Sequence, residues 1–410
     1  MRSTNPPSQK WLSVVGIGED GVAGLSEAAK RRIAAAEFVF GGKRHLLLAG
    51  ELIAGEASAW PSPFEKGIAA VVALRGRNVC VLASGDPFLH GVGATLARHV
   101  EAAEMDVLPA PSAFSLAAAR LGWSLQSTVT VSLHGKALDL IRPQLHAGQR
   151  ILALTSDADG PAALAKLLSG IGFGKSKITV LEALGGADEK ITAEQASAFS
   201  LTGVNPLNLV AIEVVADADA RILPLTPGLA DDLFEHDGQI TKRETRAATL
   251  SALSPRRGEL LWDIGSGSGS VAIEWMLADV SLVAIAIEAD AERAARIGRN
   301  AVACGVPGLK IVEGRAPQAL AGLDRPDAIF IGGGGSDDGV LQAAVDALKP
   351  GGRLVANAVT LEMETLLLAA YRARGGDLIR IAVSRAAAVG SMNGWRPAMP
   401  VTQWSWVKPW

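Results

Sequence analysis

The chain has 410 residues, which is long enough for two or three domains. Its 39 basic and 42 acidic side chains leave a net charge of -3, which argues against a nucleic-acid-binding surface or a polybasic membrane patch. The chain starts without an apolar signal segment, has no membrane-length apolar run and contains only two cysteines; we therefore expect a cytoplasmic protein without a zinc site or disulfide framework.

A first predicted strand at Trp11–Val15 leads into the loop Gly16–Gly21, which matches the Gly-x-Gly-x-x-Gly fingerprint of dinucleotide sites. Glu37 lies about 20 residues further on, where an acid would bind the ribose of NAD. Glu19 and Asp20, however, lie inside the loop and would repel a pyrophosphate. The charges favour a cofactor without phosphate, and an NAD-dependent oxidoreductase is kept as the alternative.

Three further segments of this half are candidates for a site. Lys43 and Arg44 follow two glycines and could grip a carboxylate-rich ligand, or could be the solvated start of a helix. The run Ser84–Pro87 follows an apolar strand, and the carboxyl ends of strands form the ligand crevice of α/β sheets. By itself Gly-Asp-Pro could also be a surface turn. Pro109–Ser112 leads into an alanine-rich helix, and we expect the Ser112 hydroxyl to be free near its start.

The next segment, from about residue 128 to 215, is a second α/β region without a convincing catalytic cluster. His134 could line a site, although its position favours a residue that only ends a strand. A polar stretch with proline and glycine then predicts a linker between about residues 216 and 238. The predicted strands and the helix of this region are Thr128–Leu133, Arg150–Leu154, Lys177–Leu181, Leu209–Val215 and Pro161–Ser169.

A short helix opens the C-terminal half. Thr241 and Glu244 have the spacing of a capping box, which would explain both residues structurally. Capping does not explain why Lys242, Arg243 and Arg246 crowd the same helix. We expect these three cations to hold substrate carboxylates.

An apolar strand ends at Asp263, and Gly265, Gly267 and Gly269 then form a loop before a helix. Alternate glycines let the backbone turn tightly and bring amides close to a ligand. Amides beside a carboxylate, without a matching basic residue, suit a zwitterionic or cationic ligand better than a phosphate. Glu288 ends the next strand, where a ribose would lie. S-adenosylmethionine fits this pattern, with both acids orienting it; a purely structural glycine loop is the alternative.

Later segments add to the same crevice. Lys310–Pro317 contains a strand that ends near it, and Asp327–Ile331 is followed by Gly332–Gly335, where missing side chains let a large ligand approach the backbone. The tail Trp395–Trp406 alternates like an edge hairpin strand. Arg396, within it, is another candidate for holding substrate carboxylates.

With these glycines, the two acids and Lys-Pro-Gly-Gly before a late strand, the C-terminal half resembles the class I S-adenosylmethionine-dependent methyltransferases. Residues 239–246 and 313–317 narrow the resemblance to decarboxylating precorrin methyltransferases that act at C15 of the corrin ring. The resemblance implies a Rossmann-like domain over residues 235–410. The cofactor contacts that it implies are Thr241, Asp263, Gly265, Ser266, Gly267, Ser268, Gly269, Glu288 and Ala316.

The N-terminal half resembles the tetrapyrrole methylase family through the loop Gly16–Gly21, the run Ser84–Pro87 and the run Pro109–Ser112. Within that family it is most similar to the precorrin C5-methyltransferases. The resemblance implies a two-lobed α/β fold over residues 1–220. The implied cofactor contacts are Gly16, Gly18, Gly85, Asp86, Pro87 and Ser112, and the candidate substrate contacts are Lys43 and Arg44.

Together the two resemblances cover nearly the whole chain and imply a bifunctional enzyme of cobalamin synthesis with one S-adenosylmethionine in each half. It would methylate precorrin-6B at C5 and C15 and release the C12 acetate carboxyl as CO2, giving precorrin-8. Enamine-like ring carbons need positioning more than a strong base, so neither a catalytic triad nor a metal is expected. The alternatives are a cofactor sensor or a methyltransferase for protein or RNA, and the near-neutral charge counts against RNA. We expect a homo-oligomer that binds no nucleic acid or membrane.

Overall fold

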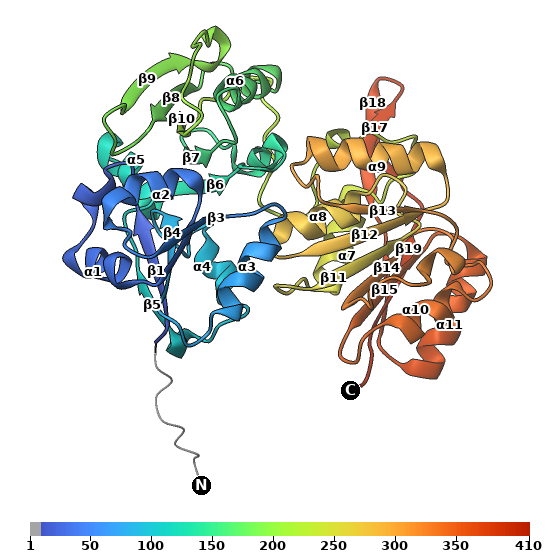
Figure 1. Ribbon diagram of the computed structural model, residues 1–410. Helices are drawn as coiled ribbons and strands as arrows, with labels where there is room; N and C mark the ends of the chain where they lie inside the picture. The colour runs from blue at the N-terminus through green and yellow to red at the C-terminus, as the bar shows by residue number, and fades with distance from the viewer. Residues whose placement is uncertain (1–9) are drawn as a thin grey trace. The chain divides into compact units, whose positions relative to one another are not determined.

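The computed structural model describes residues 10–410 and divides them into two units, each of which is described by itself (Figure 1). The first unit ends at Arg221. The second unit runs from Ile222 to Trp410 and also includes the short segment Asp139–Leu145. Within residues 10–410, no helix has the length and apolar character needed to cross a lipid bilayer.

The first lobe of the first unit is a five-stranded parallel sheet with the order β3-β2-β4-β1-β5. Helices α1 and α2 pack on one face and α3 and α4 on the other, so the central strands are buried on both faces and are almost entirely apolar. The elements are β1 (Leu12–Ile17), α1 (Glu27–Ala35), β2 (Phe38–Gly41), α2 (Lys43–Ala49), β3 (Glu56–Ala59), α3 (Phe64–Ala73), β4 (Val79–Ser84), α4 (Val92–Leu96) and β5 (Met105–Leu108).

The second lobe is a mixed sheet with the order β6-β7-β10-β8-β9, in which only β6 and β7 are parallel. Its four predicted strands and its helix are confirmed to within two residues at each end. Strand β9 was not predicted, because it is a mostly exposed edge strand without an apolar stripe. The elements are α5 (Ala113–Leu121), β6 (Thr128–Ser132), β7 (Arg150–Leu154), α6 (Gly160–Gly170), β8 (Lys177–Glu182), β9 (Lys190–Gln195) and β10 (Asn208–Glu213).

The second unit is a three-layer structure around a seven-stranded sheet with the order β13-β12-β11-β14-β15-β19-β16. Helices α7, α8 and α9 pack on one face, and α10 and α11 pack on the other (Figure 1). Its elements are α7 (Arg243–Leu253), β11 (Leu260–Ile264), α8 (Ser270–Ala278), β12 (Val283–Glu288), α9 (Ala291–Ala303), β13 (Lys310–Glu313), β14 (Ala328–Ile331), α10 (Val340–Ala347), β15 (Arg353–Ala358), α11 (Leu361–Arg374), β16 (Asp377–Ile381), β17 (Ser384–Val389), β18 (Met392–Pro397) and β19 (Val401–Val407).

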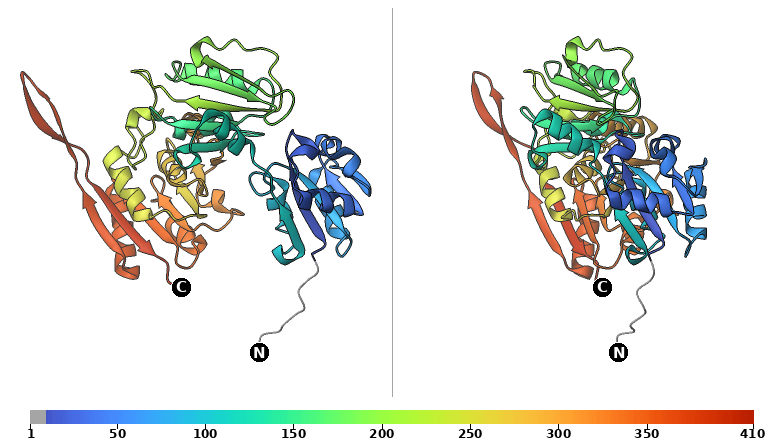
Figure 2. Two further views of the ribbon diagram at one scale, coloured as in Figure 1. Left: turned by 90° about the vertical axis from the view of Figure 1, so that its left-hand side faces the viewer. Right: turned by 60° about the vertical axis from the view of Figure 1, so that its left-hand side comes forward.

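The tail differs from the expected edge strand. Strand β19 lies inside the sheet and pairs antiparallel with both β15 and β16, and Trp404 on it is completely buried. The preceding part of the tail, β18, instead pairs with β17 in a hairpin that projects from the sheet, as Figure 2 shows in red. The sequence alternation predicted a strand correctly but could not show which strands would flank it.

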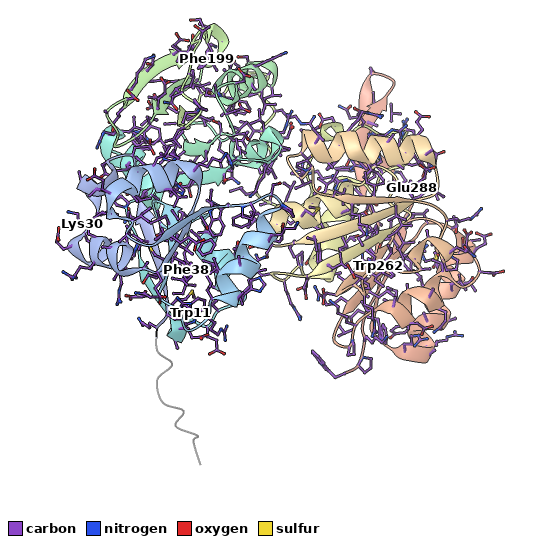
Figure 3. All side chains as sticks on the ribbon, viewed as in Figure 1. Trp11, Lys30, Phe38, Phe199, Trp262 and Glu288 are labelled. Atoms are coloured by element: carbon purple, nitrogen blue, oxygen red, sulfur yellow. The ribbon has the colours of Figure 1, made fainter. Side chains whose placement is uncertain are left out.

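The core of the second unit also includes chain that precedes its first helix. Leu223, Leu229 and Phe234 are buried against residues of α7, α8 and α9. Much of the stretch expected to be a linker is therefore packed into this core. Trp262, labelled in Figure 3, is only 2% exposed and packs on the opposite face of the sheet, among residues of α10 and α11.

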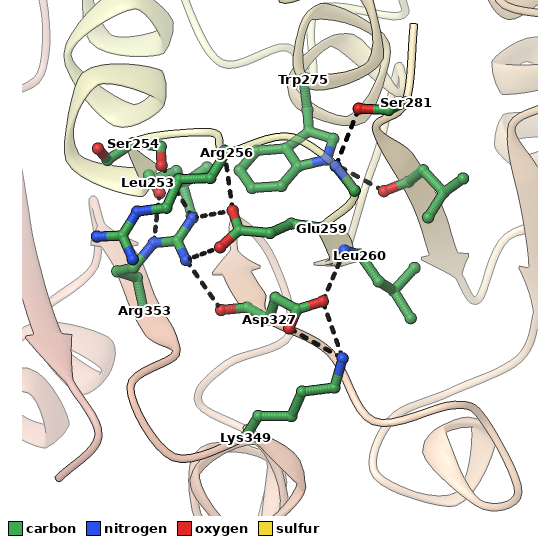
Figure 4. Close-up of polar contacts among 12 residues, drawn as sticks. Leu253, Ser254, Arg256, Glu259, Leu260, Trp275, Ser281, Asp327, Lys349 and Arg353 are labelled. Atoms are coloured by element: carbon green, nitrogen blue, oxygen red, sulfur yellow. Dashed lines mark hydrogen bonds and ion pairs between the residues drawn. The ribbon is translucent and has the colours of Figure 1, made fainter. Parts of the chain in front are cut away.

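A polar network ties the amino ends of the strands to the end of α7 (Figure 4). Arg353, at the start of β15, forms two hydrogen bonds with the Glu259 carboxylate, at 2.6 and 2.5 Å, and donates to the carbonyls of Leu253 and Ser254 at 2.9 Å. The Arg353 side chain is only 6% exposed. A buried guanidinium whose donors are satisfied fixes the helix end onto the sheet. Its removal would leave the Leu253 and Ser254 carbonyls without this donor, and the Glu259 carboxylate with only the Arg256 amide as a partner.

Replacing Arg353 with Ala should therefore lower the free energy of unfolding by about 3–5 kcal/mol. Arg380, on β16, pairs with Glu364 but has a side chain that is 61% exposed, so Arg380→Ala should cost less than about 1 kcal/mol. Urea unfolding of the intact chain, followed by circular dichroism, compares the two. Equal losses for both variants would contradict the structural role assigned to Arg353.

Candidate functional site

Close backbone contacts shape the glycine loop that follows β11. Gly265 has a φ of +67° and Gly267 a φ of +61°, a left-handed region that residues with a Cβ rarely adopt. A Cβ on Gly265 would lie 2.2 Å from the carbonyl oxygen of Gly333, just beyond the neighbouring strand β14. Because β12 and β14 flank β11 on opposite sides, the loop lies at the switch point of the sheet, where α/β folds bind ligands.

Asp263 holds this loop from inside the protein. Its Oδ2 accepts hydrogen bonds from the Ser266 hydroxyl at 2.8 Å and from the Ala272 amide at 3.1 Å. Its Oδ1 is buried without a partner, and the residue is only 1% exposed. Burial raises the pKa of this carboxyl from an ordinary 3.8 to about 6. Asp263 therefore determines the shape of the loop.

Glu288 ends β12 and binds the same loop from the side of the cavity. Its Oε2 accepts a hydrogen bond from the Gly267 amide at 2.8 Å, and its Oε1 accepts one from the Asp290 amide at 3.0 Å (Glu288 is labelled in Figure 3). A carboxylate has about four acceptor positions, so two amides leave room for ligand hydroxyls. The geometry fits the predicted contact with a ribose.

A cavity of about 730 Å³ opens along the segments that follow β11, β12, β13, β14 and β15. Its volume lies in the range typical of small-molecule sites. The cations on its wall are Lys242, Arg293, Arg315 and Arg385. The predicted site residues that the structure brings together on this wall are Thr241, Lys242, Gly265, Ser266, Gly267, Glu288 and Ala316.

Three predicted cofactor contacts, Asp263, Ser268 and Gly269, do not lie on the cavity wall. Ser268 is 1% exposed, and its carbonyl accepts a hydrogen bond from the Asn300 amide nitrogen at 2.8 Å. Gly269 caps α8 at a point where a Cβ would lie 2.8 Å from Ile297. Contrary to the expectation, these residues shape the loop and do not face a ligand.

The prediction that Arg246 binds substrate is wrong. Its side chain is completely buried, with ion pairs to Glu274 at 2.5 Å and to Asp231 at 3.2 Å. It also donates to the carbonyls of Leu229 and Thr241. The guanidinium anchors the chain before α7, and its complete burial keeps it away from a ligand.

The expected capping box does not form either. Helix α7 begins at Arg243, and Lys242 is its N-cap without a side-chain hydrogen bond. The Glu244 carboxylate instead pairs with Arg385 of the β17–β18 hairpin. Long-range pairing thus replaced the local cap that the sequence pattern favoured.

Arg243 and Arg396 are exposed and lie outside the cavity wall. Arg385, by contrast, lies directly across the hairpin from Arg396 and lines the cavity. No sequence signal separates these two arginines, because only the fold of the hairpin decides which one faces α7.

Asn357 is a second site residue that the sequence reasoning missed. It is the penultimate residue of β15 and lies on the cavity wall. Its side chain donates to the Thr249 hydroxyl at 3.0 Å and accepts from the Gln403 side-chain amide at 2.9 Å. Its amide is therefore held in one orientation. A polar residue at the carboxyl end of an otherwise buried strand was the available signal.

In the first unit, the three predicted motif loops meet at the carboxyl ends of β4, β1 and β5, which are adjacent in the sheet. A Cβ on Gly16 would lie 1.9 Å from the carbonyl oxygen of Gly85, and one on Gly85 would lie 2.8 Å from that of Pro111. The glycines let these backbones touch. Gly18 belongs to the same loop, next to the Asp20 carboxylate, whose Oδ1 would lie 2.7 Å from an added Cβ.

The polar side chains of these loops are mostly used locally. Ser112 is the N-cap of α5, so its hydroxyl accepts from the Ser115 amide at 3.1 Å and is not free as expected. Asp86 accepts from the Phe88 amide at 2.8 Å, and Pro87 is buried. A ligand here would meet backbone more than charged side chains.

Lys43 and Arg44 are the first two residues of α2, as expected if they form the solvated start of a helix. Of the two, only Lys43 is exposed. Arg44 forms an ion pair with Glu19, which weakens the charge argument against a dinucleotide. The position of Glu37 is a better argument against a dinucleotide. Glu37 directly precedes β2 and pairs with Arg77, so it lies at the amino end of that strand, whereas the motif loops lie at the carboxyl ends. It cannot bind a ribose there.

Comparisons with known proteins agree with both halves of this description. Residues 12–199 match the family described as tetrapyrrole (corrin/porphyrin) methylases, and residues 232–408 match the precorrin methyltransferase domain. A precorrin-6Y C(5,15)-methyltransferase (decarboxylating) from a Sinorhizobium species is 65% identical over 398 residues, which cover 97% of this chain and 96% of the relative. The protein of that name from Mycobacterium tuberculosis is 42% identical over 97% of this chain and 100% of its own. A Salmonella typhimurium cobalt-precorrin-6B C(15)-methyltransferase (decarboxylating) is 34% identical over 181 residues, 42% of this chain and 92% of its own.

The raised pKa of Asp263 predicts a pH-dependent stability. The folded chain binds a proton at this carboxyl between about pH 4 and pH 6, whereas the unfolded chain has lost it. The contribution of Asp263 to the unfolding free energy is therefore highest below pH 4 and falls by about 3 kcal/mol as the pH rises through 6. Asp263→Asn should lack this fall. Urea titrations at several pH values compare the two, and parallel curves would contradict the assignment.

Proposed function

Since this chain belongs to the decarboxylating precorrin-6Y C5,15-methyltransferases, we propose that each of its halves holds its own S-adenosylmethionine. The enzyme is an S-adenosylmethionine-dependent methyltransferase of cobalamin biosynthesis, acting at C5 and C15 of a precorrin and removing one carboxyl group as CO2. The proposal assigns the two activities to separate sites, the C5 reaction to residues 1–220 and the C15 reaction with decarboxylation of the C12 acetate to residues 235–410.

The proposal for the C15 site rests on the hydrogen bond from the Gly267 amide to Glu288, at the switch point of the second unit. Glu288 would bind the ribose hydroxyls, and the donor would lie against the backbone of Gly265, Ser266 and Gly267, which line the cavity. The unpaired Oδ1 of Asp263 lies beneath that loop, where a positive charge above it would lower its electrostatic cost. When bound, the donor supplies a sulfonium methyl group for transfer to a carbon nucleophile.

Charge on the cavity wall supports a carboxylate-fringed substrate. Lys242, Arg315 and Arg385 line the cavity, and each also has a carboxylate partner nearby, so a substrate carboxylate could exchange with that partner. Apolar side chains lie beside these cations, and a bound ring that covered them would displace water, which would strengthen such contacts and favour the loss of a carboxylate as neutral CO2. The apolar residues are Val359, Ile381, Val383, Met399 and Val401.

In the first unit the contact among the Gly16, Gly85 and Pro111 backbones supports a second donor site. The three loops follow adjacent parallel strands, which is the usual position of a ligand crevice. Glu19 and Asp20 do not repel a ligand that lacks phosphate. This half would present its methyl group to C5 of the same class of ring.

We also propose that the chain is a homo-oligomer of the cytoplasm. Val389, Met392 and Trp395 expose 61%, 73% and 77% of their surface on the β17–β18 hairpin, which supports association. The chain has only two cysteines, Cys80 and Cys304, and both are buried, which is compatible with a reducing compartment.

Replacing Glu288 with Ala should weaken donor binding in the second unit only. Hydrogen bonds to a charged group contribute about 1.5–3 kcal/mol, so the affinity should fall at least about tenfold. Calorimetry on the intact chain should show two donors bound by the wild type and one weakened site in the variant. The KM for donor should rise for C15 methylation and stay constant for C5 methylation.

Glu313 is the matched control, because it lies opposite Glu288 in the ladder but outside the cavity wall. Glu313→Ala should bind both donors as the wild type does. A wild-type chain that binds a single donor, or a Glu288→Ala variant that loses both reactions equally, would contradict the two-site proposal.

Replacing Arg385 with Ala should raise the KM for the tetrapyrrole in C15 methylation by about tenfold, because one charged hydrogen bond is lost. Donor affinity should not change. The same substitution at Arg396, its cross-strand neighbour outside the cavity wall, should have little effect on this KM. Steady-state kinetics with varied tetrapyrrole measures both, and a larger effect at Arg396 would restore the role that the sequence suggested for it.

A further inference from the structure

A compact polar cluster lies where β4 ends and α2 begins. It consists of Ser84, the last residue of β4, and of Arg44 and His45 in the first turn of α2. The His45 Nε2 lies 2.8 Å from the Ser84 hydroxyl oxygen, and the Arg44 Nη2 lies 3.0 Å from that oxygen and 3.1 Å from the His45 Nε2. The three side chains thus form a closed triangle of polar contacts.

The chemistry of these groups defines where the protons lie. A guanidinium has only donors, so Arg44 donates to both Ser84 Oγ and His45 Nε2. His45 Nε2 is therefore the unprotonated nitrogen of a neutral imidazole, and the ring proton is on Nδ1. With one Oγ lone pair bound to Arg44, the Ser84 hydroxyl proton also points to Nε2, so that the two donors share the single lone pair of this nitrogen. The cluster is a hydroxyl aimed at an imidazole base.

The surroundings keep this imidazole neutral. Its Nδ1 is buried without a hydrogen-bond partner, and burial together with the adjacent Arg44 lowers the pKa of His45 to about 4. Arg44 is itself balanced by Glu19, which comes from the loop after β1. A partly buried, neutral histidine without a carboxylate orienting its second nitrogen has no evident structural purpose here, because replacing it with an apolar side chain would leave no charge unpaired.

The hydroxyl is the accessible end of the cluster. Ser84 is exposed, whereas His45 lies behind it. Ser84 directly precedes Gly85, whose backbone contacts both Gly16 and Pro111 in the proposed donor site. A ring held against those loops would therefore lie on the same edge of the sheet as Ser84.

We propose that Ser84 and His45 form a proton-accepting pair for the C5 reaction, in which Ser84 faces the tetrapyrrole and His45 acts through it. This inference rests on the proposed function of residues 1–220 as the C5 site. Arg44 is the positioning residue of the pair, since it fixes both the hydroxyl rotamer and the imidazole tautomer.

Methyl transfer to C5 requires an acceptor for one proton. The ring carbon C5 forms a bond to the methyl carbon as the sulfur–methyl bond breaks, and that electron pair stays on sulfur. The ring system thereby gains one positive charge. Loss of the hydrogen on C5 as a proton returns its bonding pair to the ring and restores neutrality. Ser84 Oγ takes that proton while its own proton moves to His45 Nε2, and the imidazolium later releases it to water.

A weakly basic imidazole is sufficient for this role, because the proton leaves a cationic ring and not a neutral one. The ring therefore needs an acceptor held at the correct position more than a strong base. Positioned proton transfer of this kind contributes about 10²–10⁴-fold to a rate.

The matched substitutions are His45→Gln and Ser84→Ala. A glutamine can still accept the hydrogen bond from Ser84 but cannot take the proton, and an alanine at the exposed Ser84 removes the hydroxyl with little risk to folding. For both, kcat for C5 methylation should fall at least about a hundredfold. The KM for tetrapyrrole and the donor affinity measured by calorimetry should stay within about twofold of the wild type, since neither variant removes a binding contact. Ser84→Thr should restore most of the rate.

The experiment uses the intact chain with a precorrin-6 substrate and a donor carrying a ¹³C-methyl group. The C5 and C15 methyl groups are then distinguished by NMR, so the C5 rate is measured separately. His99→Gln, an exposed histidine outside the cluster, is the control and should keep the wild-type rate.

Two readouts separate a proton-accepting role from a structural one. Added imidazole should rescue a His45→Gly variant, whereas pyrazole, which has the same shape but is a far weaker base, should not. In the wild type without substrate, the ¹⁵N spectrum should show His45 neutral at pH 7, with its proton on Nδ1.

A His45→Gln chain that methylates C5 at the wild-type rate, equal rescue by pyrazole, or a proton on Nε2 would overturn the pair while leaving two donor sites intact. A fall in kcat that is matched by lost donor binding would also overturn it. A wild-type chain that binds no donor in the first unit and adds no methyl at C5 would instead overturn the proposed function of that half, and the pair with it.

Discussion

Two carboxylates that hold a glycine loop in place are the constraint on which the second unit depends. Asp263 binds the loop from inside the sheet, and Glu288 binds it from the neighbouring strand. The loop can follow this path only because Gly265 has no Cβ to collide with Gly333. A cationic sulfonium donor suits such a site, since both acids lie beneath or beside the place where its charge would be. Beside the loop the two carboxylates thus favour a positive group, whereas the cations elsewhere on the cavity wall favour negative groups.

The donor site proposed for the first unit would be built differently. Its three loops touch through backbone at Gly16, Gly85 and Pro111, and their polar side chains are largely engaged in caps and turns. Binding there would depend on shape and amides. Beside these loops, Arg44, His45 and Ser84 contact one another through polar side-chain atoms. We therefore assign this cluster a part in the reaction itself.

Charged side chains in the second unit divide into two groups by burial. Arg246 and Arg353 are almost completely buried and satisfy every nearby carboxylate and carbonyl, so they act in folding. Arg315 and Arg385 are exposed, each with one carboxylate partner that a ligand could replace. Salt bridges of the second kind contribute little stability, which makes them suitable for exchange with a substrate.

The sequence by itself determined the α/β class, most strands, the glycine loops and the two acids of the second unit, because these depend on local backbone geometry and on apolar periodicity. It also carried the family resemblance. It did not determine which of several neighbouring cations meets the cavity. Arg246 and Arg385 differ only in what lies around them after folding: the first is enclosed by Glu274 and Asp231, and the second is brought over α7 by a hairpin. Likewise, His45 and Ser84 are 39 residues apart, and only the pairing of parallel strands places them within hydrogen-bonding distance. Contacts between distant segments depend on the packing of the whole sheet, and no local pattern encodes them.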